Sequence, residues 1–392
     1  MALIFWLSIF VVIYTFVGYG FVLFILVRIR RAIKGARPLP VSSDASLPSC
    51  TLVVAAYNEE NYITEKIKNT LELRYPAGKL SLVFITDGSS DRTPELIAQY
   101  QQIRLMHSPE RKGKIAAVHR AVTEVTTDAI VFTDANTFLN PDALINLCRH
   151  YSDPTVGAVA GEKRVSAGET ADASSAGEGF YWKYESKLKK WDSELYSVVG
   201  AAGELFSVRK SLYLPVSPDS IIDDFMISML IAQKGYRIIY EPEAYAVETA
   251  SENVTEELKR KVRIAAGGMQ SIVWLAGLLN IFKYGMLSFQ YISHRVLRWT
   301  VTPFLLVLAL ILNALLAAQP GAVLYQLLFI CQLGFYLLAL AGFILEKRQL
   351  RVKALFVPYY FCVMNYAVIA GIIRYFRKKQ SAAWEKSKRK EG

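Results

Sequence analysis

Long apolar runs lie near both ends of the chain, and between them short apolar segments alternate with amphipathic ones. Residues 3–27 carry no charged side chain, and neither do residues 299–345, which Gln319-Pro320-Gly321 divides into two stretches. Another apolar stretch, residues 354–373, follows a short basic loop. About 20 residues of α-helix cross the hydrocarbon core of a bilayer. The pattern therefore predicts one membrane-spanning helix near the start of the chain and about three near its end.

The first apolar run is expected to remain as an anchor. A cleaved signal peptide has a charged start and a shorter apolar core, whereas this run starts uncharged. Residues 266–298 read as amphipathic helices in the membrane interface, because polar residues such as Lys283 interrupt them. The remaining predicted segments outside the middle domain are an N-terminal transmembrane anchor (1–29), a basic juxtamembrane linker (30–49), C-terminal transmembrane helices (299–373) and a basic tail (374–392).

The net charge of the chain is concentrated beside these apolar runs. Of a formal net charge of +11, residues 28–37 carry +5 and residues 374–392 carry +6, so the rest sums to zero. A nucleic-acid-binding protein would spread its basic residues over a folded face, so no nucleic acid is expected as a partner. Basic residues beside membrane helices are retained in the cytoplasm. We therefore expect a multi-pass protein of the cell (plasma) membrane with a cytoplasmic middle domain.

The charge rule conflicts with the predicted number of spans. One anchor followed by three later spans would place the basic tail outside the cell. Three explanations remain open at the level of sequence: residues 271–290 also span, one late segment is re-entrant, or the charge rule does not hold here.

Residues 50–265 show the pattern of an α/β domain. The predicted strands are Thr51–Ala56, Leu82–Thr86, Ile103–Met106, Ala129–Thr133 and Val156–Gly161. Predicted helices lie near 60–73, 93–101, 114–124 and 141–151. Such alternation is typical of a mostly parallel, Rossmann-like sheet, in which ligands bind at the carboxyl ends of the strands. The four cysteines show no CxxC spacing, so neither a disulfide framework nor a zinc site is expected.

Acidic residues follow three of the predicted strands, namely Glu59, Asp87 and Asp134. Helix capping explains a residue such as Asp91, but the helix after Asp134 begins seven residues later, at Pro141. Asp134 and Asn136 offer the oxygen ligands that Mg²⁺ or Mn²⁺ prefers, and either ion can bridge a diphosphate. The basic segment 111–114 can add cationic contacts, although it lacks the spacing of a P-loop.

Several segments in order resemble the motifs of family 2 glycosyltransferases with a GT-A fold. These segments are Val53–Glu60, Thr86–Thr93, Phe132–Thr137, Gly200–Gly203, Asp223–Phe225, Gly235–Arg237, Tyr240–Pro242 and Arg260–Arg263. The resemblance covers about residues 50–300, and membrane-bound cellulose, hyaluronan and poly-N-acetylglucosamine synthases share this plan. It implies a GT-A glycosyltransferase domain over residues 50–265, accompanied by transmembrane α-helices.

The resemblance also implies roles for individual residues. Asp224 is the expected general base, although a negative charge there is also what the N-terminus of a helix favours. Asp134 and Asn136 are the expected metal ligands. Substrate binding is assigned to Tyr57, Glu59, Asp87, Lys114, Asp134, Gly203 and Arg263. Among these, Tyr57 and Asp87 are expected at the nucleotide base, and Lys114 and Arg263 near the diphosphate.

Two positions depart from the family pattern, and one pair of carboxylates is read as part of a solvated helical face. Asn136 stands where the metal motif usually ends in Asp, and Ile264 stands where processive synthases usually have Trp. The second departure leaves open whether transfer is processive. Glu185 lies seven residues after Glu178, which predicts a solvated helical stripe.

The leading interpretation is an inverting glycosyltransferase that moves a sugar from a nucleotide-sugar donor, a UDP-sugar, to a growing cell-surface or exported polysaccharide. One base without a carboxylate nucleophile means a single displacement, hence inversion. The alternative is transfer of one sugar to a membrane lipid acceptor. A transporter or scaffold is disfavoured, because the predicted spans show neither the charged residues nor the repeats of transporters.

Overall fold

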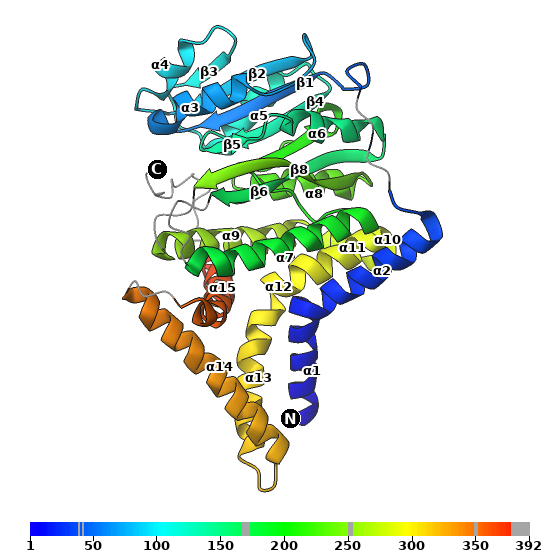
Figure 1. Cartoon of the computed structure of the whole chain (residues 1–392), viewed down its shortest axis with the longest axis vertical. Helices are drawn as coiled ribbons and strands as arrows, with labels where there is room; N and C mark the ends of the chain where they lie inside the picture. Colours follow the sequence, from blue (N-terminus) through cyan, green and yellow to red (C-terminus); the bar gives the residue numbers. More distant parts are fainter. Residues whose placement is uncertain (38–39, 41–42, 167–172, 250–253, 349–351, 378–392) are drawn as a thin grey trace.

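The computed structural model describes residues 1–37, 40, 43–166, 173–249, 254–348 and 352–377 (Figure 1). The α/β domain lies at one end of the molecule, and long helices extend from its other side (Figure 1). The described residues contain eight strands, namely β1 (Cys50–Ala56), β2 (Leu80–Asp87), β3 (Arg104–Ser108), β4 (Ala129–Asp134), β5 (Thr137–Leu139), β6 (Val156–Ser166), β7 (Leu205–Arg209) and β8 (Arg237–Thr249).

The strands form one sheet in the order β3-β2-β1-β4-β7-β6-β8-β5. Strands β3, β2, β1 and β4 pair in parallel, whereas β7 is antiparallel to both β4 and β6. The five strands expected from the apolar runs are all present, and the expectation of a mostly parallel sheet is confirmed. The sequence pattern did not identify β5, β7 or β8.

Helices cover both faces of the sheet. The surrounding helices of the domain are α3 (Glu60–Leu71), α4 (Thr93–Ala98), α5 (Lys114–Glu124), α6 (Ala143–Cys148) and α8 (Asp223–Gln233). Every residue of β1 is buried, as expected for a central strand between two helical layers. Its Val53 packs in the core with α5 and α8, and its neighbour Val54 packs in the opposite core with α3, α4 and α6. The alternation of side chains along a strand therefore builds two cores.

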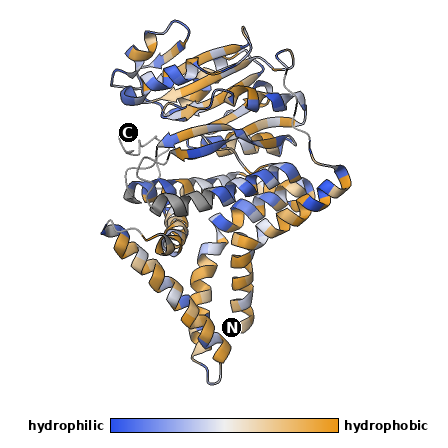
Figure 2. Ribbon diagram, in the orientation of Figure 1, coloured by the Kyte–Doolittle hydropathy of each residue, from blue (hydrophilic) through white to orange (hydrophobic). Residues whose placement is uncertain are grey.

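A second layer of helices lies between the domain and the long apolar helices (Figure 1). It contains α7 (Ala173–Leu195), α9 (Val254–Trp274), α10 (Ile281–Tyr284), α11 (Met286–Tyr291) and α12 (Leu297–Trp299). Figure 2 shows mixed polar and apolar residues along α9, whereas α1 (Ala2–Ile13), α13 (Val301–Ala317) and α14 (Val323–Lys347) are almost uniformly apolar. This difference is that between amphipathic and membrane-spanning helices.

Three helices of the described chain are long and apolar enough to cross a membrane: Ala2–Lys34, Val323–Glu346 and Ala354–Phe376. The first comprises α1, a π-helical turn and α2 (Tyr19–Lys34). A fourth span results if Met286–Trp299 and Val301–Ala317, which meet at a 55° bend, count as one.

A buried polar cluster ties the N-terminal helix to the layer above it. It comprises Tyr19, Glu185, Asp192, His294, Arg295 and Arg298. The Tyr19 hydroxyl donates to Asp192 Oδ1 over 2.5 Å, and His294 Nδ1 lies 2.6 Å from Asp192 Oδ2. Glu185 Oε1 lies 2.9 Å from Arg295 Nη1, and its Oε2 lies 2.9 Å from Arg298 Nη1. The expected solvated stripe is therefore wrong for Glu185, which is 3% exposed; the side chain of Glu178 lies outside the described residues.

Candidate active site

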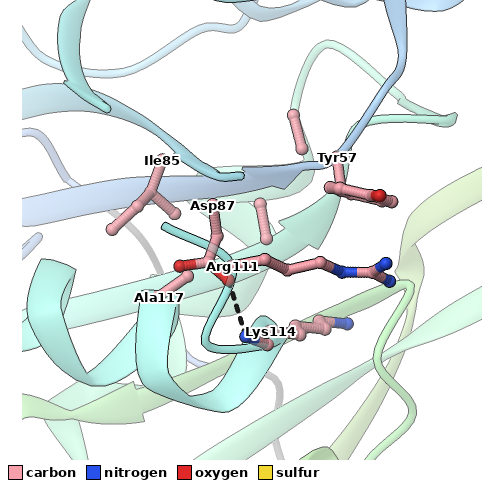
Figure 3. Close-up of a pocket in the computed structure, with 9 residues that line it drawn as sticks. Tyr57, Ile85, Asp87, Arg111, Lys114 and Ala117 are labelled. Carbon is pink, nitrogen blue, oxygen red and sulfur yellow. Dashed lines mark hydrogen bonds between the residues drawn. The ribbon is translucent and has the colours of Figure 1, made fainter. Parts of the chain in front are cut away.

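The carboxyl ends of β1, β2 and β4 meet at one edge of the sheet. Their register places Ala55 beside Asp134 and Ala56 beside Thr86, so Tyr57, Asp87 and Asp134 come together. Figure 3 shows Tyr57, Asp87, Arg111 and Lys114 around one pocket. A second pocket shares Ala55 and Lys114 with the first and is also lined by Asp134, Gly203 and Asp223.

Asp87 fixes the loop that closes the first pocket. Its Oδ2 accepts hydrogen bonds from the backbone nitrogens of Lys112 (2.7 Å) and Gly113 (2.6 Å). Its Oδ1 lies 3.6 Å from Arg120 Nη1, on the next turns of α5. The carboxylate is 5% exposed. The basic loop is thus held in place by the acid that the sequence assigns to the nucleotide.

Arg111 covers the aromatic face of Tyr57. Its guanidinium carbon lies 4.0 Å from the centre of the Tyr57 ring, which is a cation–π contact. Gly88 allows the loop to come this close, because a Cβ atom at Gly88 would lie 2.5 Å from the Arg111 Cβ. The sequence placed Arg111 in a general basic segment but did not pair it with Tyr57.

Lys114 and Asp134 form an ion pair between the two pockets. Lys114 Nζ lies 2.6 Å from Asp134 Oδ1, and both side chains are about one-fifth exposed (21% and 20%). Burial lowers the pKa of Lys114, but the carboxylates of Asp134 and Asp223 outweigh it and raise that pKa above its usual value. Lys114 is therefore a permanent cation beside two acids.

Asn136 presents a buried oxygen that lacks a partner. Its Oδ1 has no hydrogen bond within the described part of the chain, and such groups normally have one. Asp134 lies two residues earlier, so a carboxylate and an amide oxygen are available to a hard cation. No group of three or more His, Cys, Asp or Glu able to hold a metal occurs among the described residues. The donor set fits Mg²⁺ or Mn²⁺ if the ligand supplies further oxygens.

Asp224 lies at the start of α8, beside Gly203, whereas its neighbour Asp223 is the acid of this helix that lines the second pocket. A Cβ atom at Gly203 would lie 3.2 Å from Asp224 Oδ2 and 3.6 Å from Lys114 Nζ, so the glycine leaves room beside both charges. Burial, together with the neighbouring Asp223, raises the pKa of Asp224 to about 7. A carboxyl group with such a pKa can accept a proton near neutral pH.

Lys66 and Glu204 were not identified from the sequence. Lys66 is fully buried on α3, and its Nζ donates to Thr137 O (2.6 Å) in the turn that follows Asp134. Glu204 O accepts from Thr133 Oγ1 (2.8 Å), which joins the Asp134 turn to Gly203. Burial raises the pKa of Glu204, but the ion pair with Lys163 (2.5 Å) outweighs it and holds that pKa below its usual value.

Neither Glu59 nor Arg263 is among the residues that line these two pockets. Glu59 occupies the N-cap position of α3 and is 2% exposed. Its backbone nitrogen donates to Thr93 Oγ1 over 2.8 Å, which links the loops after β1 and β2. Arg263 lies on α9, below the sheet. Their assigned substrate contacts stay predictions.

Comparison with known proteins gives one domain-level match. Residues 51–214 match the sequence family described as "Glycosyl transferase family 2". The poly-beta-1,6-N-acetyl-D-glucosamine synthase of Staphylococcus aureus (strain MSSA476) is 29% identical over 237 residues, which is 58% of this chain and 56% of that protein. That of Staphylococcus epidermidis is 24% identical over 242 residues, or 59% and 57%. The chain therefore spans little more than half the length of these curated relatives.

The fold is shared with a solved protein over nearly the whole chain. The mannosyltransferase PcManGT from Pyrobaculum calidifontis, solved in complex with GDP-Man and Mn²⁺, superimposes with a TM-score of 0.68 at 23% sequence identity. The match covers 96% of this chain and 100% of that one, so it extends to the helices beyond the α/β domain. The GT-A fold expected from the sequence is confirmed.

Proposed function

We propose that this chain, which contains a family 2 glycosyltransferase domain at residues 51–214, is an inverting, membrane-bound enzyme. It moves a sugar from a nucleotide-sugar donor, a UDP-sugar, to a growing cell-surface or exported polysaccharide. The observation that carries the proposal is the meeting of Asp134, Lys114 and Asp224 around Gly203. The candidate membrane helices support a location in the plasma membrane, and the proposal puts the catalytic domain in the cytoplasm, where nucleotide sugars are made.

The first pocket suits the nucleotide. The ring of Tyr57 and the guanidinium of Arg111 offer flat faces on which a base stacks. Asp87 holds the loop that carries Arg111, and its second carboxylate oxygen, Oδ1, lies near Arg120. The diphosphate then extends toward Lys114, whose permanent positive charge faces Asp134. Cations at this point stabilise the charge that develops on a diphosphate leaving group.

A divalent cation is part of the proposal. Asp134 and Asn136 would hold Mg²⁺ or Mn²⁺, which would supply Lewis-acid stabilisation of the departing diphosphate. In the ligand-free protein Lys114 pairs with Asp134 Oδ1. This ion pair neutralises the carboxylate until donor and cation bind together.

Asp224 is the proposed general base. The acceptor hydroxyl approaches through the space left by Gly203 and donates its proton to Asp224 as the new glycosidic bond forms. Asp134 and Asp224 have different surroundings, because Asp134 is paired with Lys114 whereas Asp224 is buried beside Asp223. If this base acts on the acceptor alone, the sugar is transferred in a single displacement with inversion.

A lipid acceptor is the second candidate. Ile264 stands where processive synthases usually carry Trp, which favours one transfer per acceptor. The matched regions of the poly-N-acetylglucosamine synthases favour a polymer. Product length separates the two.

The test uses the full-length protein in detergent with UDP-glucose, UDP-N-acetylglucosamine and GDP-mannose. Each donor is supplied with Mn²⁺, Mg²⁺ or a chelator, and released nucleotide diphosphate is measured together with product length. We expect metal-dependent turnover of one UDP-sugar and a polymeric product. Asp224→Asn is the inactive control, and Asp219→Asn, an exposed acid before α8, is the matched active control. Failure of all donors with lipid and glycan acceptors would overturn the proposal.

A further inference from the structure

The last described helix, α15 (Lys353–Phe376), runs in a different direction from the other apolar helices. Figure 1 shows α1, α13 and α14 from the side, along the length of the molecule, but α15 strongly foreshortened. Its 24 residues would extend about 36 Å at 1.5 Å per residue, enough to span a bilayer. Its contacts show where its two ends lie.

The first half of α15 crosses the end of α14. Helix α13 leaves the domain and α14 returns toward it (Figure 1). A Cβ atom at Gly342, near the returning end of α14, would lie 2.6 Å from Leu355 O. The rings of Phe343 and Tyr359 lie 6.0 Å apart. Residues near 355 of α15 are therefore on the same side as the catalytic domain.

The second half of α15 packs against α9, which also lies on the side of the domain. A Cβ atom at Gly371 would lie 2.6 Å from Ala265 Cβ and 2.8 Å from Val262 O. Val368 and Ile372 complete this contact with Ala265. Helix α9 in turn contributes Ile272 to the main core of the domain. The end of α15 is thus at the same level as its beginning.

We propose that α15 does not cross the bilayer but lies along the membrane surface on the side of the domain. One face packs on α9, and the opposite face contacts the lipids of that leaflet. Tyr366 and Ile373, seven residues apart and therefore on the same outer face, are 60% and 45% exposed. Four tyrosines are spread along the helix, at 359, 360, 366 and 375, and tyrosine favours the membrane interface.

The charges of the sequence support this placement. Residues 346–353 carry four basic side chains and one acid, hence +3, and residues 374–392 carry +6. A spanning α15 would put these two basic segments on opposite sides of the membrane, whereas a helix in the plane keeps both on one side. The basic run at 28–37 lies on that side as well. The inference goes beyond the proposed function and is independent of the reaction catalysed.

Depth measurement in reconstituted vesicles tests the orientation. In full-length protein with the four cysteines replaced by Ala, Tyr366→Cys and Ile373→Cys each receive a spin label. The two sites are seven residues apart, about 10 Å along a helix, and lie on the same face. We expect equal depths, within the band of about 5–10 Å that interfacial helices occupy. Leu333→Cys and Leu340→Cys in α14, also exposed and seven residues apart, are the spanning control and should differ in depth.

Labelling of intact cells tests the side of the tail. In the same background we expect Ser381→Cys to react with an impermeant maleimide only after permeabilisation, as Gln101→Cys in the domain does. Gln319→Cys, in the turn between α13 and α14, should react without it. Different depths at 366 and 373, or external labelling at 381, would overturn the proposal. Equal melting temperatures of the labelled variants show that none has unfolded.

Discussion

Nζ of Lys114 lies 2.6 Å from Oδ1 of Asp134, so the first residue of α5 pairs with the last residue of β4. The pair uses the same carboxylate that is proposed to bind a cation. Lysine and cation therefore compete for Asp134 unless a diphosphate arrives to take the lysine. This relation leads to the first prediction.

Lys114→Met is expected to strengthen binding of Mn²⁺ alone and to weaken binding of UDP with Mn²⁺. The change removes the competitor of the cation but also a positive charge near the diphosphate. Calorimetric titration of each ligand measures both effects. Lys112→Met, an exposed lysine two residues earlier, is the control. Weaker binding of Mn²⁺ alone would contradict the competition.

Asp134→Ala is expected to lower metal-dependent turnover at least about 100-fold. Loss of a residue that only supports a metal ligand already costs about 10–100-fold in metal affinity or activity. Asn136→Asp should be active and should bind Mn²⁺ more tightly, because a carboxylate replaces the unpartnered amide oxygen. Metal titration of initial rates measures both variants. Asp142→Ala, an exposed acid outside the site, should behave as the unmodified protein. Full activity of Asp134→Ala would remove the residue from the site.

Asp224→Asn is expected to lower turnover by about 10²–10⁴-fold while nucleotide affinity is retained. In the unmodified protein kcat/KM should rise with pH and level off above about 7, because the base must be ionised and its pKa is about 7. Rates between pH 5 and 9 test this. Turnover within about tenfold of the unmodified protein would exclude the role of a base.

Asp224→Asn, which is expected to lower turnover, is expected to increase the stability of the folded protein at high pH. The pKa of Asp224 in the folded protein, about 7, lies above the ordinary value of 3.8. Between these two pH values the folded protein retains a proton that the unfolded chain has lost. Stability therefore falls as pH rises through this window, and Asp224→Asn should raise the melting temperature at pH 8 but not at pH 4. A favourable helix-dipole role predicts a loss instead.

Lys66→Met is expected to destabilise the protein by about 1–3 kcal/mol, because the buried Thr137 carbonyl loses its donor. The turn that carries Asp134 and Asn136 should loosen, which raises the Mn²⁺ concentration needed for half-maximal turnover. Melting curves and metal titration measure the two effects. Lys68→Met, exposed on the same helix, is the control and should change neither. An unchanged metal requirement would limit Lys66 to a role in stability.

Gly371→Leu is expected to lower the melting temperature in detergent, because its Cβ atom would meet Ala265 and the backbone of α9 within 2.8 Å. Overpacking of this kind typically costs about 1–3 kcal/mol. Gly334→Leu in α14 is the matched control, since nothing lies within 4 Å of a Cβ atom there. Equal melting temperatures would mean that α15 does not rest on α9.

The sequence was most informative where a strand is buried on both faces. Thr51–Ala56 and Ala129–Thr133 are continuous apolar runs that end at polar residues, and both are strands. β8 escaped detection because Pro242 and several acids interrupt it, and its pairing with β6 depends on register shifts that no local pattern encodes.

The candidate site was predictable only for residues that follow strands. Asp87 and Asp134 lie where the ends of β2 and β4 bring them. Lys66 was not predictable, because a lysine in an amphipathic helix is normally exposed; its burial depends on the carbonyl of Thr137, distant in sequence. The orientation of α15 was equally hidden, since composition describes how apolar a helix is and not what it packs against.

The contact of Tyr19 with Asp192 bears on any attempt to obtain the domain as a water-soluble fragment. Removal of residues 1–34 would leave Asp192 without the hydroxyl donor of Tyr19. It would also leave Glu194 without Arg31, whose Nε lies 2.5 Å from Glu194 Oε1. The exposed apolar surface of α7 would then favour aggregation. An unrelated membrane helix would restore attachment to the membrane but not these contacts. Chimeric proteins should therefore exchange the domain together with its own first helix.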